Sequence, residues 1–254
     1  MVIATDVMPK VVAAIPCYNE ERFIGDVVHR ASNYVDEVIV IDDGSRDGTS
    51  KVAREAGACV VNHPSNGGYG ESIKSCFHVA RECKADVLVI LDGDGQHNPD
   101  ELPRVLSPIL SGEADMVIGS RFMCRTNHVP RYRKLGIDTI TWLFNIGSPV
   151  KVSDSQSGFR AYGHKILDTV TIIESGMGVS VELLVEARKR NCVILEVPIS
   201  CEYHAECSTI NPVSHGINVA LAVVKLRFRN RLNVTPSTVH SETMAVREHS
   251  RLNK

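Results

Sequence analysis

Two aspartates separated by a single glycine, Asp92 and Asp94, follow directly on the apolar run Val87–Leu91. The run predicts a buried strand, and residues two apart in an extended chain point to the same side, so the two carboxylates should converge. Unpaired carboxylates that close raise each other's pKa. A divalent cation relieves that repulsion, and the amide oxygen of Gln96 would suit it as a further ligand. The alternative is an ordinary Asp-Gly surface turn, but a turn requires neither the second aspartate nor the glutamine. The pattern therefore predicts a divalent metal site at Asp92, Asp94 and Gln96.

The composition is that of an ordinary globular protein. The chain has 254 residues, a net charge of −2 and 43% hydrophobic residues, so nothing in its charge suggests a nucleic-acid partner. Its eight cysteines include no Cys-x-x-Cys pair, and no apolar leader precedes the first predicted strand. We therefore expect reduced thiols and a cytoplasmic protein. No apolar run approaches the roughly 18 residues that cross a bilayer, which leaves peripheral contact with a membrane open.

The first 120 residues alternate between strand-like and helix-like patterns. Short apolar runs predict strands at Val11–Ile15, Val38–Ile41, Cys59–Val61, Val87–Leu91 and Met116–Ile118. Helical spacing predicts helices at Glu20–Ser32, Asp47–Ala56, Tyr69–Cys83 and Pro99–Leu110. Such alternation predicts an α/β fold, with a mainly parallel central sheet flanked by helices on both faces. Ligands of these folds bind outside the carboxyl ends of the strands.

Polar residues follow three of the predicted strands at that edge. They are Pro16–Glu20, Asp42–Ser45 and Asp92–Asp94. A single solvated loop would explain one polar tip, but not three at equivalent positions. The glycine-rich stretch Asn66–Gly70 opens the third helix. It serves either as a plain helix entry or as a backbone contact to a phosphate, and the two alternatives stay open.

The pattern changes after residue 120. Arg121, Arg125, Arg131, Arg133 and Lys134 form a basic stretch, which is either a phosphate-binding segment or a solvated loop. An amphipathic segment follows at Lys134–Asn145, then a helix at Val181–Arg190 and a strand at Val193–Ile199. Pro198 predicts an edge position for that strand. A C-terminal helix is expected at Ile217–Phe228, with basic residues extending to Arg231. It lies either on an anionic membrane surface or against the core. Residues 233–254 are expected to be disordered.

Five motifs occur in the order of one known family: Ile15–Glu20, Asp42–Ser45, Asp92–His97, Gly119–Arg121 and Ser157–Arg160. Together they resemble the family 2 glycosyltransferases of the GT-A fold, and most closely the branch of dolichyl-phosphate mannose and glucose synthases. The resemblance implies one catalytic domain over residues 1–232. Residues 10–120 would then bind the nucleotide-sugar, and residues 121–232 would bind the acceptor.

The resemblance also implies roles for single residues. Nucleotide-sugar contacts fall on Pro16, Tyr18, Glu20, Asp43, Asp92 and Ser157. The ligands of Mg²⁺ or Mn²⁺ on the diphosphate are Asp92, Asp94 and Gln96. Arg121 and Arg133 resemble the arginines that bind the acceptor phosphate. An arginine suits this role because its planar guanidinium donates two hydrogen bonds to a phosphate. The catalytic set is Asp94, Arg121, Asp154 and Arg160, with Ser157 and Arg160 in a segment that closes around the donor.

The implied reaction is transfer of a hexose, with inversion, from a GDP- or UDP-linked sugar to a dolichyl or polyprenyl phosphate. A phosphate acceptor with a second pKa near about 6 is already an anionic nucleophile and needs no strong base. A hydroxyl acceptor would need one, and Asp154 and Glu182 are the candidates. Two alternatives remain: a soluble or glycan acceptor, and a non-catalytic nucleotide-binding module. The donor and the oligomeric state stay open, although exposed residues around Trp142 and Phe144 could serve a homo-oligomer.

Overall fold

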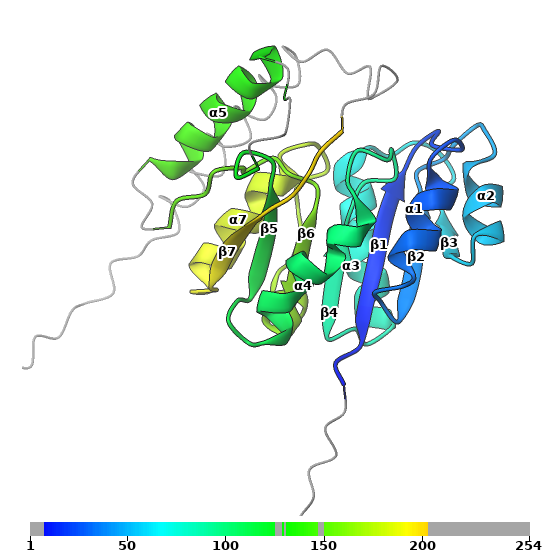
Figure 1. Cartoon of the computed structure of the whole chain (residues 1–254), viewed down its shortest axis with the longest axis horizontal. Helices are drawn as coiled ribbons and strands as arrows, with labels where there is room; N and C mark the ends of the chain where they lie inside the picture. The colour runs from blue at the N-terminus through cyan, green and yellow to red at the C-terminus, as the bar shows by residue number, and fades with distance from the viewer. Residues whose placement is uncertain (1–7, 125–128, 130, 147–149, 203–254) are drawn as a thin grey trace, which may run out of the picture.

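The computed structural model of the chain describes residues 8–124, 129, 131–146 and 150–202, with the backbone alone for residues 131–133 (Figure 1). The C-terminal helix expected at Ile217–Phe228 and the tail expected over residues 233–254 lie outside these ranges. Within them, no helix is both long and apolar enough to cross a membrane.

A seven-stranded sheet forms the centre of the described part. Its strands are β1 (Val11–Cys17), β2 (Glu37–Asp42), β3 (Cys59–Asn62), β4 (Val87–Ile90), β5 (Met116–Ser120), β6 (Arg160–Gly163) and β7 (Ile194–Pro198). The order across the sheet is β3-β2-β1-β4-β6-β5-β7, and every pairing is parallel except the two made by β6. The prediction of a mainly parallel sheet is confirmed. Pro198 ends β7, which is an edge strand as expected.

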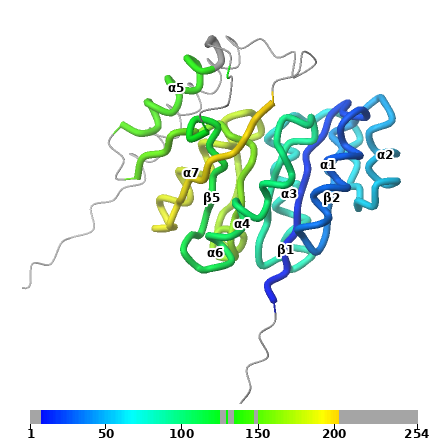
Figure 2. Tube along the Cα trace, viewed as in Figure 1, coloured from blue at the N-terminus to red at the C-terminus, as the bar shows by residue number. Residues whose placement is uncertain are grey.

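Helices cover both faces of the sheet, as Figure 2 shows along the Cα trace. They are α1 (Ile24–Ala31), α2 (Thr49–Glu55), α3 (Tyr69–Glu82), α4 (Leu102–Leu110), α5 (Arg131–Asn145), α6 (His164–Thr169) and α7 (Val179–Lys189), with a 3₁₀ turn, η1, at Pro99–Glu101. Asn98 caps η1 by accepting a hydrogen bond from the Asp100 amide at 3.1 Å, and Pro99 follows it as predicted.

Alternate residues of each strand feed two separate cores. In β1, Val12 and Ala14 pack with residues of α3, α6 and α7, whereas Ala13 and Ile15 pack with residues of α1 and α4. Because successive side chains of a strand point to opposite faces, a strand covered on both sides has to be apolar at every position. All seven residues of β1 are indeed buried, which explains why the sequence shows unbroken apolar runs.

Two elements were not predicted, and a third begins later than predicted. β6 and α6 follow each other directly over residues 160–169, where the sequence predicted neither. β6 is four residues long, begins with Arg160 and runs antiparallel between β4 and β5, so it gives no strand-like apolar run. The first helix also begins at Ile24 rather than at residue 20, because Glu20–Phe23 form a turn whose carbonyl at Glu20 accepts from the Phe23 and Ile24 amides.

Candidate active site

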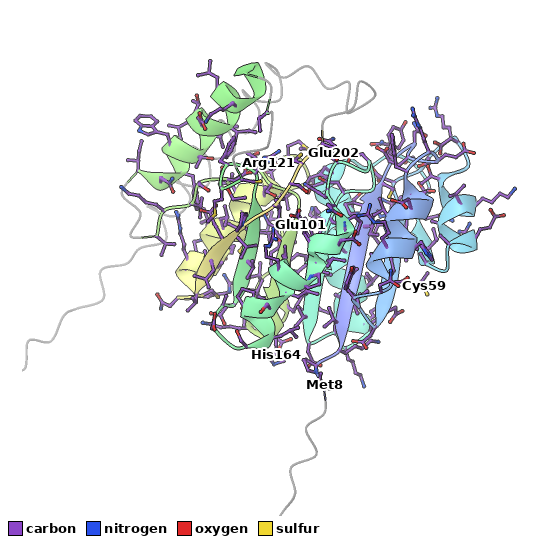
Figure 3. All side chains as sticks on the ribbon, viewed as in Figure 1. Met8, Cys59, Glu101, Arg121, His164 and Glu202 are labelled. Atoms are coloured by element: carbon purple, nitrogen blue, oxygen red, sulfur yellow. The ribbon has the colours of Figure 1, made fainter. Side chains whose placement is uncertain are left out.

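The polar tips that follow β1, β2 and β4 meet at one edge of the sheet. These strands are parallel neighbours with β1 in the middle, so their carboxyl ends lie together. The Asp43 amide donates to the Cys17 carbonyl at 2.9 Å and ties the tip of β2 to that of β1. Arg121, at the end of β5, lies along the same edge (Figure 3). The predicted location of the site is therefore where the topology places these residues.

Three carboxylates, Glu20, Asp92 and Asp94, form an anionic cluster at this edge. Burial, then repulsion by Asp94 and Asp92, raises the pKa of Glu20 to about 7. Burial raises the pKa of Asp92 to about 6, against the opposing effect of Arg121 and Arg160. Burial and then Asp92 also raise the pKa of Asp94. The cluster carries more negative charge than its surroundings compensate, which is the property expected of a cation site.

The chemistry of this cluster fits a hard divalent cation. The Asp94 carboxylate accepts from the Gln96 backbone amide at 3.0 Å and also from the Gln96 side chain, so two of the three predicted ligands are in contact. Among the described residues, no group of three or more His, Cys, Asp or Glu is arranged to hold an ion by itself. Carboxylate and amide oxygens are nevertheless the ligands that Mg²⁺ and Mn²⁺ prefer. These residues therefore suit a cation that takes its other ligands from elsewhere.

Glycines let two segments pack directly on this cluster. A Cβ at Gly93 would overlap the Cys17 sulfur, and a Cβ at Gly158 would overlap the Asp92 carboxylate. Gly158 belongs to the segment 154–160, which precedes β6. The segment before β6 thus approaches Asp92 closely at Gly158, where there is no side chain.

Asp43 organises the neighbouring glycine loop. Its carboxylate is buried and accepts from the amides of Gly67 and Gly68, at 2.9 and 2.8 Å. His63 contacts the same carboxylate through Nδ1 at 2.6 Å, and its Nε2 lies 2.8 Å from the Ser75 hydroxyl. Gly68, with φ at +88°, forms the N-cap of α3, which confirms the helix entry at this stretch. Two more of the expected nucleotide contacts lie nearby: Pro16 is buried in β1, and Tyr18 is 40% exposed at the edge.

Arg121 and Asp154 form a buried, bidentate pair. Arg121 donates through Nε at 2.7 Å and through Nη2 at 2.8 Å to the two Asp154 oxygens, and its own amide donates at 3.2 Å. Asp154 is fully buried; burial alone would raise its pKa, but Arg121 outweighs that effect and holds the pKa below its usual value. A carboxylate in this state is a weak proton acceptor, so the geometry favours a role in holding Arg121 over the general base considered above.

Three further candidates turn out to be internal. Arg160 is 2% exposed and donates to the carbonyls of residues 155, 157 and 180, so its position gives no support to direct contact with reacting atoms. Ser157 is fully buried and accepts from the Phe159 amide. Glu182 is 1% exposed and accepts from the amides of residues 173 and 174, which is a structural role rather than that of a base. The Ser157–Arg160 motif therefore lies in a buried turn.

The remaining predicted residues lie on α5. Arg133 falls in its first turn, where the structure describes only the backbone. Trp142 is 63% exposed, as expected of a surface residue. Phe144 was expected to be exposed with it, and this expectation is wrong: Phe144 is 3% exposed, and the Arg188 guanidinium lies 3.5 Å from its ring centroid. The helical period turns these two residues, two positions apart, to different faces.

Two histidines at the site were given no role in the sequence analysis. His63 braces Asp43, as described above. His97 is buried beside the Phe159 ring, and its Nδ1 lies 3.4 Å from the Asp92 amide. Burial lowers the pKa of His97 to about 4, so its ring is neutral at pH 7. No spacing in the sequence pairs His63 with Asp43, because His63 follows β3 whereas Asp43 follows β2.

Comparison with known proteins decides the family. The family model described as Glycosyl transferase family 2 matches residues 12–171, a span that includes the acidic cluster, Arg121 and Asp154. This chain belongs to glycosyl transferase family 2. The enzyme class predicted from the motifs is thereby confirmed: the protein is a glycosyltransferase.

Curated relatives of this family 2 glycosyltransferase carry related names. The chain is 30% identical over 229 residues to UDP-N-acetylglucosamine--dolichyl-phosphate N-acetylglucosaminyltransferase of Methanococcus voltae, covering 82% of this chain and 89% of that protein. It is 30% identical over 220 residues to a dolichyl-phosphate hexose transferase of Haloferax volcanii, covering 85% and 93%. It is 32% identical over 207 residues to an undecaprenyl-phosphate mannosyltransferase of Micrococcus luteus, covering 75% and 83%. These names support the predicted branch.

Solved structures confirm the fold. A crystal structure of glucosyl-3-phosphoglycerate synthase from Mycobacterium tuberculosis with Mn²⁺, UDP and phosphoglyceric acid matches this glycosyltransferase with a TM-score of 0.69. The match covers 85% of this chain and 78% of that one at 24% identity. The predicted GT-A fold is confirmed by this likeness, which at that identity concerns the fold alone.

Proposed function

We propose that this glycosyltransferase moves a hexose from a UDP- or GDP-linked sugar to a dolichyl or other polyprenyl phosphate. Relatives with high coverage are named for dolichyl phosphate or undecaprenyl phosphate. The observation that carries the proposal is the meeting of two charge environments at one sheet edge. The acidic cluster and Arg121 lie along the same edge (Figure 3), and Arg121 opposes the rise in the pKa of Asp92 without cancelling it.

The acidic cluster is proposed to serve the donor. Asp92, Asp94 and Gln96 would hold Mg²⁺ or Mn²⁺, which, when bound, stabilises the negative charge that develops on the departing diphosphate. Glu20, Asp43 and Tyr18, around the tips of β1 and β2, would bind the nucleoside. The glycine loop held by Asp43 offers a backbone surface that a ligand can approach closely.

Arg121 is proposed to receive the acceptor phosphate, with Arg133 as a second contact. The acceptor's phosphate oxygen attacks the anomeric carbon and forms the new carbon–oxygen bond as the bond to the donor diphosphate breaks. The nucleoside diphosphate leaves with that electron pair, and the configuration inverts. The nucleophile is already ionised at neutral pH, so no residue has to remove a proton. This agrees with a site in which Asp154 is buried and paired.

A partition experiment tests the acceptor. The protein is incubated with Mn²⁺, dolichyl phosphate in detergent micelles, and radiolabelled UDP-glucose, UDP-N-acetylglucosamine or GDP-mannose. We expect label in the organic phase with one of these donors. Asp94→Asn should abolish that label, and Asp168→Asn, an exposed carboxylate on α6, should leave it unchanged. Label that accumulates only in a water-soluble product would instead indicate a soluble acceptor. Nucleotide binding without any turnover would indicate a non-catalytic module.

A thermal-shift screen tests the donor. A ligand at about 100 times its Kd stabilises the folded state by about 2.7 kcal/mol. Stabilisation by one nucleotide-sugar, and only with the cation present, would identify both the base and the hexose.

Because a polyprenyl phosphate resides in a bilayer, the proposed function requires the protein to work at a membrane surface.

A further inference from the structure

Glu196 is an acidic residue in the middle of the apolar edge strand β7. Its partners among the described residues are not cations. One oxygen accepts from the Ser153 amide at 2.7 Å, and the other accepts from the Asp154 amide at 3.0 Å and the Ser153 hydroxyl at 3.1 Å. A carboxylate that binds two successive backbone amides fixes the path of that backbone. Glu196 therefore acts as a clamp on residues 153 and 154.

The clamped segment leads directly to Arg121. Asp154 presents both carboxylate oxygens to the Arg121 guanidinium, and their orientation depends on where the Asp154 backbone lies. The Ser153 hydroxyl also lies 2.7 Å from the hydroxyl of Ser120, the residue before Arg121. Arg121 is thus held through its side chain by Asp154 and through its neighbour by Ser153. Glu196 holds both of those partners.

We propose that Glu196 is a positioning residue for the acceptor phosphate: by clamping residues 153 and 154, it sets the orientation of the Arg121 guanidinium. The inference rests on the proposed function, in which Arg121 binds that phosphate. In this proposal Glu196 acts through residues 153 and 154 rather than on a substrate. A planar guanidinium binds phosphate through directed hydrogen bonds, so a rotation of the Asp154 segment would weaken acceptor binding without disturbing the donor side.

Steady-state kinetics of two substitutions test the proposal. Glu196→Ala removes all three hydrogen bonds, and Glu196→Gln keeps the shape and one acceptor oxygen. We expect Glu196→Ala to lower kcat/KM for polyprenyl phosphate about tenfold, the loss typical of residues that orient a ligand-binding group. Glu196→Gln should fall in between and carries the test if the alanine variant does not fold. The Kd for the donor nucleotide should change less than twofold.

Asp115→Asn is the matched control. Asp115 also accepts from a backbone amide next to β7, that of Val193 at 2.7 Å, but at the opposite end of the sheet from Arg121. The Asp115→Asn substitution should leave kcat/KM for polyprenyl phosphate unchanged. Equal effects of Asp115→Asn and Glu196→Gln on kcat/KM would show that loosening β7 is sufficient, and would overturn the proposal.

A double-mutant cycle identifies the route. If Glu196 acts through Arg121, then Glu196→Ala should have no further effect on kcat/KM in an Arg121→Ala background. Independent, multiplying losses would overturn the proposal. If the wild-type protein transfers nothing to polyprenyl phosphate, the proposed function fails separately. The same cycle measured by thermal unfolding then decides whether Glu196 and Arg121 are coupled, and additive losses would refute that coupling.

Discussion

The two halves of the described chain handle buried charge in opposite ways. In residues 8–120, Glu20, Asp92 and Asp94 gather at one edge of the sheet, and burial raises the pKa of each; Arg121 and Arg160 offset only part of that effect at Asp92. In the half that begins at Arg121, Asp154 is more deeply buried, yet Arg121 holds its pKa low. The first half has to receive positive charge from a ligand, whereas the second already contains its own. Under the proposed function, this contrast means that the donor side requires a cation from outside, whereas the acceptor side is preorganised by Arg121 and Asp154.

The largest expected effect is on the acidic cluster. Asp94→Asn removes one charge and one oxygen ligand, so transfer should fall by about 10²–10³-fold, as it does when one preorganised group facing developing charge is lost. The folded state should be as stable as the wild type or more stable, because the repulsion with Asp92 decreases. Initial rates and melting curves, with Asp168→Asn as the control, measure both. Full activity in Asp94→Asn would remove the cation from the proposal.

The preorganised half should show the reverse behaviour. Asp154→Ala leaves Arg121 without its buried partner, and breaking a buried ion pair costs about 3–5 kcal/mol. We expect the free energy of unfolding to fall by about 3 kcal/mol, whereas Asp92→Asn should not lower it. Urea denaturation of the two variants makes the comparison directly. Equal losses would mean that the halves do not differ in the way described.

A smaller effect is expected at the glycine loop. His63→Ala removes the 2.6 Å contact to Asp43, and a hydrogen bond to a charged group contributes about 1.5–3 kcal/mol. Part of that should appear as a fivefold to tenfold weaker Kd for the donor nucleotide, because the amides of Gly67 and Gly68 still hold Asp43. His78→Ala, on the exposed side of α3, is the control. Isothermal titration with UDP and with GDP measures the change.

The smallest expected effect is the pH dependence of stability without metal. The pKa values of Asp92 and Glu20 are raised in the folded state, so folding favours their protonated forms. Their contribution is therefore most favourable below about pH 4, and it is lost as the pH rises through about 6 to 7. In EDTA, raising the pH from 5 to 8 should lower the melting temperature of the wild type by a few degrees more than that of Asp92→Asn. Added Mn²⁺ should raise the melting temperature of the wild type more at pH 8 than at pH 5, because protons compete with the metal for the carboxylates.

The sequence predicted the donor half well because local rules determine it. Each buried strand there is an apolar run, each is followed by a helix of ordinary spacing, and parallel topology brings the tips of β1, β2 and β4 together. Asp92 and Asp94 could be located from that alone. The predicted spans Cys59–Val61, Tyr69–Cys83 and Val87–Leu91 differ from β3, α3 and β4 by one residue each.

The acceptor half depends on contacts that no local pattern encodes. β6 is recognisable as a strand only because β4 and β5 lie on either side of it. Arg160 resembles a catalytic arginine in its motif, but its donors are used by three carbonyls brought together in the fold. The partnership of Glu196 with residue 154 spans 42 positions and could not be found without coordinates.

The missing side chain at Gly158 has a consequence for how the two halves communicate. A Cβ at Gly158 would overlap the Asp92 carboxylate, so that carboxylate packs directly against the segment leading to β6. Any movement of Asp92 toward an incoming ion changes the room available to residues 154–160, and that segment begins with the partner of Arg121. Gly158 lies four residues from Asp154, so under the proposed function an ion bound at Asp92 would be coupled through this segment to the residue that orients Arg121.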